Sequence, residues 1–219
     1  MKEIGQNLEP EPLVEKLNKH WNDLCQRLNI NKDQNSFNEI VKNYSESHRH
    51  YHNLKHIDNS LGEFELIKDK LNNPEAVELA IWYHDIVYNL YESDNEEQSA
   101  ELAKTFCQKN NLSPDFTKQV EDHILFTKHT SLINNSDSQY LADIDMSILG
   151  KQPDIFDIYE KQIYKEYSTL YSKADYQKGR TKFFKTILKH PIYTTDFFKN
   201  RYEQAARDNI QRTINKLEQ

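Results

Sequence analysis

The sequence predicts an all-α protein. Apolar residues recur at steps of three and four along almost the whole chain, which is the spacing of one face of a helix. The 219 residues include only four Gly and six Pro, too few turn-forming residues for the many short connections of a β-sandwich or barrel. No internal repeat or flexible linker is visible in the sequence. We therefore expect one all-α domain over residues 1–219.

In the first half of the chain, several predicted helices have recognisable ends. Pro10 and Pro12 precede the first apolar stripe, Asn72-Asn73-Pro74 ends the third, and Asn110-Asn111 closes the fifth. The apolar stripes that define these helices span residues 13–28, 37–44, 57–71, 76–90 and 99–107.

The second half contains clearer boundary signals. Ser113-Pro114-Asp115 combines a capping Ser, Pro at the first helical position and an acid, which is typical of a helix start. A polar loop is expected at 134–138, a boundary at Gly150 and Pro153, and a capped last helix after Thr194-Thr195-Asp196. The stripes here span residues 116–127, 155–170, 183–188 and 202–217.

Composition narrows the functional classes. The net charge of -7 gives no electrostatic reason to expect binding to nucleic acid or to an anionic membrane. Cys25 and Cys107 lie far apart in helical patterns, as is typical of small core residues in a reducing compartment. The N-terminal residues lack the apolar segment of a secretion signal, and no apolar run approaches the roughly 18 residues of a membrane span. We expect a cytoplasmic protein.

The dipeptide His84-Asp85 stands in the apolar run 80–88. Because burying an unpaired charge costs several kcal/mol, a carboxylate in such a segment needs a positive partner, either a cationic side chain or a metal ion. The upstream segment 48–56 contains four of the nine histidines, and the downstream segment 142–150 contains Asp143 and Asp145 among apolar residues. A divalent cation bound by two His and two Asp explains all three segments. Such ligands suit Mn, Fe, Co, Ni or Zn better than Mg alone.

Spacing leaves the roles of the first histidines open. His52 and His56 are four residues apart, so on a helix they share a face. Both could be metal ligands, or one could bind metal while the other transfers protons. The last acidic ligand is equally open between Asp143 and Asp145 on spacing alone.

In the order of its His and Asp segments, the chain resembles the HD-domain metal-dependent phosphohydrolases. Their signature is a His, a His-Asp pair and a distant Asp on helices of an all-α fold. His56, His84-Asp85 and Asp145 match it in order. Asp145 is favoured over Asp143 because Leu149-Gly150 follows it as in other HD enzymes. The resemblance implies an HD-domain-like helical bundle with the metal site between helices.

The run Tyr51-His52-Asn53-Leu54-Lys55-His56 resembles a segment of the cyclic-nucleotide phosphodiesterases, distant relatives in this superfamily. That resemblance implies that His56 is a metal ligand and His52 the proton donor. The likeness is greatest to the small uncharacterised bacterial HD hydrolases, over most of residues 44–210. It implies a metal-site core at about 44–150, with C-terminal helices at 151–219.

Further side chains are expected near the site. Several relatives carry an acid shortly after the His-Asp pair; here Glu96 or Glu97 takes that place, and we assign it to Glu96. His129 recurs in position among the relatives. Cationic side chains that could bind phosphate oxygens, since Arg in particular offers a bidentate fork, are Arg49, Lys128, Arg180 and Arg207. The competing interpretation is that these cations are solvated or paired with acids.

The sequence therefore predicts a metal-dependent phosphohydrolase that acts on a small phosphorylated molecule, with nucleotides the foremost class. Asp85 binds metal and orients the attacking water, and His52 protonates the leaving oxygen. One alternative is a di-iron oxygenase of HD type, for which His123 and His129 are the only candidate extra ligands. The other is a module that binds a nucleotide without catalysis.

Overall fold

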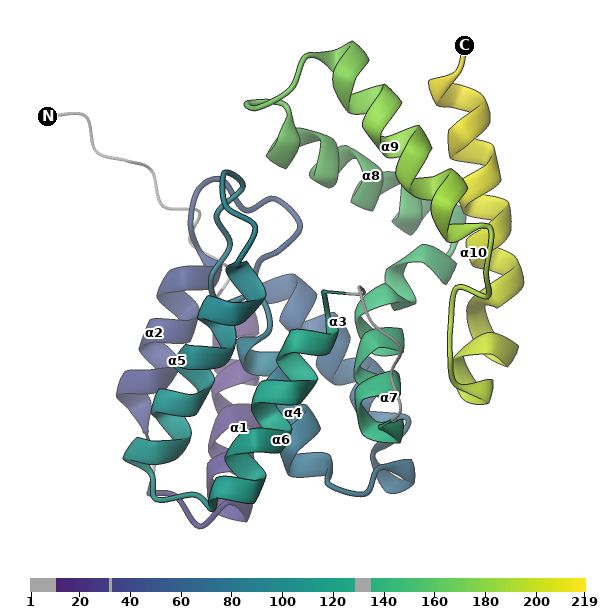
Figure 1. Cartoon of the computed structure of the whole chain (residues 1–219). Helices are drawn as coiled ribbons and strands as arrows, with labels where there is room; N and C mark the ends of the chain where they lie inside the picture. Colours follow the sequence, from purple (N-terminus) through teal and green to yellow (C-terminus); the bar gives the residue numbers. More distant parts are fainter. Residues whose placement is uncertain (1–10, 32, 129–134) are drawn as a thin grey trace, which may run out of the picture. The chain divides into compact units, whose positions relative to one another are not determined.

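The computed structural model describes residues 11–31, 33–128 and 135–219, and every regular element in these ranges is helical (Figure 1). The prediction of an all-α protein is confirmed. The α-helices are α1 (Glu11–Arg27), α2 (Gln34–Tyr44), α3 (Leu54–Glu65), α4 (Pro74–Tyr83), α5 (Asn95–Lys109), α6 (Pro114–Phe126), α7 (Ser136–Asp145), α8 (Pro153–Tyr167), α9 (Lys173–Ile187) and α10 (Asp196–Leu217). Two short 3-10 helices are η1 (Lys68–Lys70) and η2 (Met146–Gly150).

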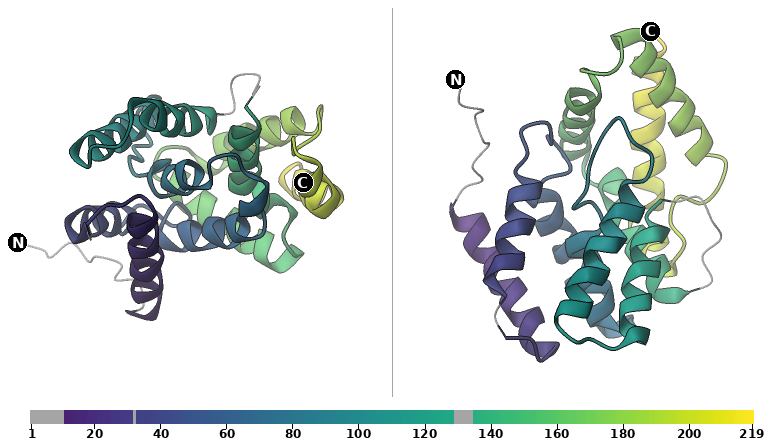
Figure 2. Two further views of the ribbon diagram at one scale, coloured as in Figure 1. Left: turned by 90° about the horizontal axis from the view of Figure 1, so that it is seen from below. Right: turned by 60° about the vertical axis from the view of Figure 1, so that its left-hand side comes forward.

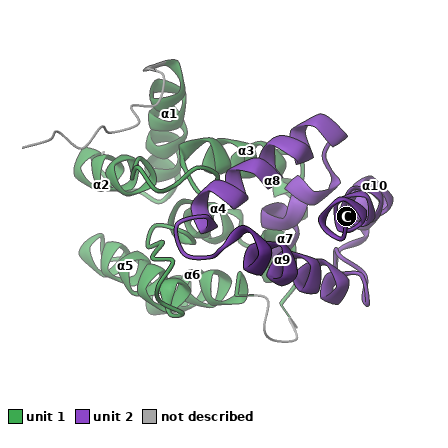
Figure 3. Ribbon diagram, turned by 90° about the horizontal axis from the view of Figure 1, so that it is seen from above, with its two compact units in different colours: residues 1–141 green, residues 142–219 purple. Residues whose placement is uncertain are grey.

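The chain divides into two compact units (Figure 3). Unit 1 comprises residues 1–141, with α1 to α6 and the start of α7. Unit 2 comprises residues 142–219, with the end of α7, η2 and α8 to α10. Two compact units can still belong to one domain that folds as a whole, so the single domain expected from the sequence stays a prediction.

Unit 1 is built around α4. Asn73 caps this helix by accepting the backbone N–H of Ala76, and the helix is buried from Ala76 to Tyr83. Helices α1, α3, α5 and α6 all pack against it. Trp82 of α4 meets Trp21 of α1 edge-on, with ring centroids 5.5 Å apart. Apart from Glu75 and Glu78 this helix is apolar, as is typical of a core helix, and its C-terminal end places His84 in the interior.

The predicted helix through residue 90 is wrong, because α4 ends at Tyr83. Beyond that point, side chains bind the backbone groups that a continuing helix would pair internally. The backbone N–H of Val87 donates to Ser99 Oγ at 3.1 Å, and Asn89 exchanges two hydrogen bonds with the Asn95 side chain. Such side-chain-to-backbone bonds compete with helix formation. Likewise α3 ends at Glu65 rather than near residue 71, and η1 follows.

The predicted start at Ser113 is confirmed: its hydroxyl accepts the N–H of Phe116, and Pro114 is the first helical residue of α6. In unit 2, α10 packs against η2 and α9, and Figure 2 shows α9 and α10 side by side. Gly150 permits the approach to α10, since a Cβ there would lie 2.5 Å from Tyr202 Cβ. None of the helices in the described ranges combines the length and apolarity that a membrane crossing requires.

Candidate metal centre

Three helix ends supply the predicted metal ligands. His56 lies in the first turn of α3, which Asn53 caps by accepting the N–H of Lys55 at 2.9 Å. His84 and Asp85 directly follow α4, and Asp145 is the last residue of α7. Both imidazoles are buried, whereas the Asp85 side chain keeps 21% of its surface exposed. An ion held here would therefore have its two nitrogen ligands in the interior and a carboxylate facing solvent.

The ligand atoms converge. His56 Nε2 lies 3.0 Å from His84 Nε2, and Asp85 Oδ2 lies 3.1 Å from His84 Nε2 and 3.6 Å from His56 Nε2. With a carboxylate oxygen of Asp145, these atoms all lie within 4.8 Å of one another. Ligand atoms about 2.1 Å from one ion are roughly 3.0–3.4 Å apart at octahedral or tetrahedral angles. The four residues could thus hold a metal ion.

The tautomer of His84 supports this assignment. Its Nδ1 lies 2.9 Å from the carbonyl oxygen of Ile81, and because a carbonyl only accepts, Nδ1 carries the proton. In the neutral ring the Nε2 lone pair then faces a second imidazole nitrogen and a carboxylate oxygen. Either a proton on His56 Nε2 or a metal ion bound among these atoms would satisfy that lone pair, and the backbone carbonyl orients the ring as it does in metal-bound histidines. The donor set fits a divalent transition metal.

Asp143 has a different environment from Asp145. Its buried carboxylate accepts hydrogen bonds from the N–H groups of Thr194 and Thr195, at 2.8 and 2.7 Å, and from the Thr195 hydroxyl. Burial raises its pKa, although these three bonds act in the opposite direction. Asp143 therefore serves the start of α10, while Asp145 belongs to the group of possible metal ligands.

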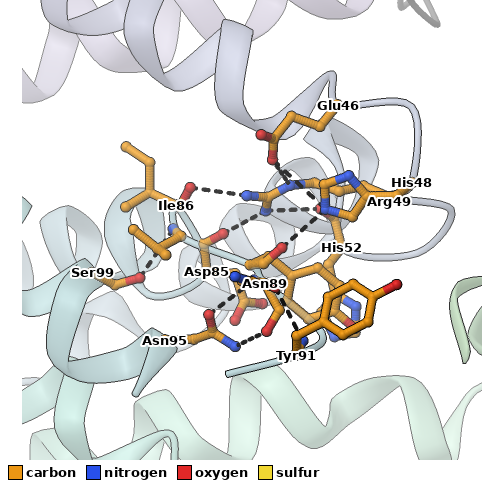
Figure 4. A network of polar contacts seen from close by, with 12 residues as sticks. Glu46, His48, Arg49, His52, Asp85, Ile86, Asn89, Tyr91, Asn95 and Ser99 are labelled. Carbon is orange, nitrogen blue, oxygen red and sulfur yellow. Dashed lines mark hydrogen bonds and ion pairs between the residues drawn. The ribbon is translucent and has the colours of Figure 1, made fainter. Parts of the chain in front are cut away.

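Arg49, expected to contact substrate, is buried beside the His-Asp segment (Figure 4). Its guanidinium donates to the carbonyl oxygens of His52, Asp85 and Ile86, and its Nε donates to Glu46. These bonds hold the backbone on both sides of the site, so the structure gives Arg49 a positioning role. Contact of Arg49 with a substrate stays a prediction.

Two tyrosines complete this arrangement, and the sequence interpretation assigned them no role at the site. Arg49 Cζ lies 5.1 Å from the ring centroid of Tyr44 and 5.4 Å from that of Tyr88. The Tyr44 hydroxyl also accepts the backbone N–H of Asp85 at 3.2 Å. Tyr44 ends a helical apolar stripe, so its spacing predicted only a core residue.

His52 lies outside the helix that carries His56, because α3 begins at Leu54. The expectation that both share one helix face is therefore wrong. The His52 ring stacks on Tyr88 at 4.3 Å and meets Tyr51 edge-on at 4.9 Å. Its centroid lies 5.9 Å from that of His56, and it is not in the four-residue group. This placement is compatible with the predicted role as proton donor.

The other expected residues form pairs of their own. Lys128 Nζ donates to Glu97 Oε1 at 2.6 Å and lies 3.9 Å from Glu96 Oε2. In unit 2, Arg180 pairs with Glu160 and donates to the Tyr159 hydroxyl. Roles for these side chains in catalysis or substrate binding stay predictions, and His129 lies outside the described residues.

His123, a candidate extra ligand for an oxygenase, is buried on α6. Its Nδ1 lies 2.8 Å from Ser138 Oγ, and burial lowers its pKa to about 4. Within the part of the chain that the structure describes, His123 does not belong to the group of possible metal ligands.

In comparisons with known proteins, no family model, curated protein or solved structure matches this chain. The likeness to HD-domain hydrolases therefore rests on the sequence segments alone, and family membership stays a prediction. The structure itself shows an all-α protein with a His/Asp group that could hold a metal ion.

Proposed function

We propose that this protein is a metal-dependent phosphohydrolase that cleaves a phosphate ester or anhydride in a small molecule, with nucleotides the foremost substrate class. The observation that carries the proposal is the convergence of two imidazole Nε2 atoms and two carboxylates at the ends of three helices. The order of these residues in the sequence, which resembles the HD signature, supports the same class.

His56, His84, Asp85 and Asp145 are the residues that hold the metal in this proposal. Two nitrogen and two oxygen donors suit Mn, Fe, Co, Ni or Zn, whereas Mg prefers oxygen ligands and several waters. When bound, such a cation lowers the pKa of a coordinated water and polarises a phosphoryl oxygen. It also supplies the positive charge that a phosphorylated substrate needs in a chain with a net charge of -7.

The protein's own groups then supply orientation and proton transfer. The partly exposed carboxylate of Asp85 orients the attacking water. Arg49 and Tyr44 hold the Asp85 backbone in place, since Arg49 donates to its carbonyl oxygen and the Tyr44 hydroxyl accepts its N–H. His52 protonates the leaving oxygen, as the Tyr51-His52-Asn53 resemblance implies. Its ring stacks on Tyr88 and meets Tyr51 edge-on, and it lies beside His56 without belonging to the group of possible metal ligands.

The test is phosphate release from a panel of nucleotides and simpler phosphate esters, each assayed with Mn²⁺, Fe²⁺, Co²⁺, Ni²⁺, Zn²⁺ and Mg²⁺. We expect metal-dependent release that His84→Ala abolishes and that His190→Ala, at an exposed position, leaves intact. Equal release by both variants would contradict the proposal. Full metal occupancy without turnover of any substrate would instead favour a binding module, and about two irons per chain with oxygen uptake would favour an oxygenase.

A further inference from the structure

Unit 2 contains a pocket of about 290 Å³ that is lined by residues of α8, α9 and α10. None of the predicted catalytic or metal-binding residues lines it. Its volume is near the lower end for small-molecule sites, enough for one ring that bears one charged group.

Tyr176 lines this pocket, and its hydroxyl is buried. The Tyr176 hydroxyl has no hydrogen-bond partner in the described structure, although its oxygen is inaccessible to solvent. Burial raises the pKa of this phenol, so the hydroxyl stays protonated and able to donate. Because a water molecule does not reach this oxygen, a ligand in the pocket does not bond to it either, and Tyr176 offers the pocket its ring.

The charges around the pocket favour an anion. Both of its acids are already neutralised by arginines: Asp157 pairs with Arg212 at 2.8 Å, and Glu160 pairs with Arg180.

Three lysines also line the pocket, and only Lys216 has a carboxylate nearby, 3.5 Å from Asp157. Among the described residues, neither Lys161 nor Lys173 forms an ion pair. In a chain with a net charge of -7, this is a local concentration of uncompensated positive charge.

The pocket also offers aromatic surface. Tyr164 and Tyr176 both line it, with ring centroids 5.0 Å apart at an interplanar angle of 64°. Such a pair presents a face and an edge to a third ring, which aromatic ligands pack against favourably.

We propose that this pocket is a binding site for a small aromatic anion. The ring of the ligand packs against Tyr164 and Tyr176, and its phosphate, phosphonate or carboxylate group accepts hydrogen bonds from Lys161 and Lys173. The site is assembled within unit 2 and does not depend on the proposed metal or on hydrolysis.

The experiment is calorimetric titration of the full chain with phenylphosphonate, whose carbon–phosphorus bond a phosphohydrolase does not cleave. We expect wild type and His84→Ala to bind it alike, and the double variant Lys161→Ala/Lys173→Ala to bind roughly tenfold more weakly. The matched control is Lys165→Ala/Lys182→Ala, which removes two exposed lysines from the same helices outside the pocket. Methylphosphonate, which lacks the ring, should bind more weakly than phenylphosphonate.

Tyr176→Phe, which keeps the ring that lines the pocket, provides a matched control. Because the hydroxyl has no partner to lose and a ligand does not reach it, this variant should keep both the thermal stability of wild type and, to within about twofold, its affinity for phenylphosphonate. The proposal is overturned if wild type does not bind phenylphosphonate, if both lysine pairs have the same effect, if binding disappears in His84→Ala, or if methylphosphonate binds as tightly as phenylphosphonate.

Discussion

Acidification should weaken the packing of α6 against the start of α7, because His123 is buried there as a neutral imidazole. Its Nδ1 meets Ser138 Oγ at 2.8 Å, and its Nε2 has no hydrogen-bond partner in the described residues. Burial lowers its pKa from 6.5 to about 4, although Asp137 and Asp122 act in the opposite direction. The folded protein therefore takes up this proton less readily than the unfolded chain does.

The sign and size follow from linkage. A histidine whose folded pKa is depressed contributes full stability above its unfolded pKa and loses it as the pH falls toward the folded value. The shift from 6.5 to about 4 corresponds to about 3 kcal/mol in total, at 1.36 kcal/mol per pKa unit. About 2 kcal/mol of this is lost between pH 7 and pH 5.

Urea unfolding of wild type and His123→Gln, each at a series of pH values, measures this loss. Both tryptophans, Trp21 and Trp82, lie in unit 1 with His123, so tryptophan fluorescence follows the relevant unit. Subtracting the variant cancels other titrating groups, including Glu78, whose pKa burial raises to about 7 and whose effect has the opposite sign. The stability difference between wild type and variant should shift against wild type by about 2 kcal/mol from pH 7 to pH 5. A difference that is constant over this range would refute the reasoning.

Three further predictions concern the candidate site. Asp145→Asn should lose metal, measured by elemental analysis, whereas Asp143→Asn should keep it. Asp143→Asn should instead lower the melting temperature, because Asp143 accepts three hydrogen bonds at the start of α10. The reverse pattern would exchange their roles. His52→Ala should retain metal but lose about 10²–10⁴-fold in kcat, with a smaller loss for p-nitrophenyl esters because their leaving group needs less protonation; an equal loss for both substrates would rule out a proton donor. Arg49→Met should destabilise the protein by about 2–4 kcal/mol in urea unfolding, since it leaves buried carbonyls without donors, and Arg49→Lys should rescue it only in part; an unchanged unfolding midpoint would remove its positioning role.

The helical class could be predicted because it depends on local signals. Apolar periodicity and the Ser113 cap act within a few residues, and both are confirmed in the structure. The end of α4 could not be predicted in the same way. It depends on Arg49, Ser99 and Asn95, whose side chains reach the 85–89 backbone from other segments. Apolar periodicity continued through this segment, so the sequence alone predicted a longer helix.

The candidate metal ligands could be predicted from the sequence, whereas the residues that hold them in place could not. The His and Asp residues stand out because charged groups in apolar runs are unusual. Asp143 and Asp145 look equivalent locally, and their difference arises from the start of α10, about 50 residues further along the chain. Arg49 was predicted to contact a phosphate because its guanidinium offers a bidentate fork, and its burial next to the rings of Tyr44 and Tyr88 was not visible in the sequence.

The central claim is that His56, His84, Asp85 and Asp145 bind one divalent metal ion. The most direct measurement is metal content after loading and dialysis, for wild type, His84→Ala, Asp85→Ala and the exposed control His190→Ala. We predict about one ion per chain in wild type and in His190→Ala, and almost none in the other two, while circular dichroism still shows a helical protein. Full occupancy in both His84→Ala and Asp85→Ala would contradict the claim.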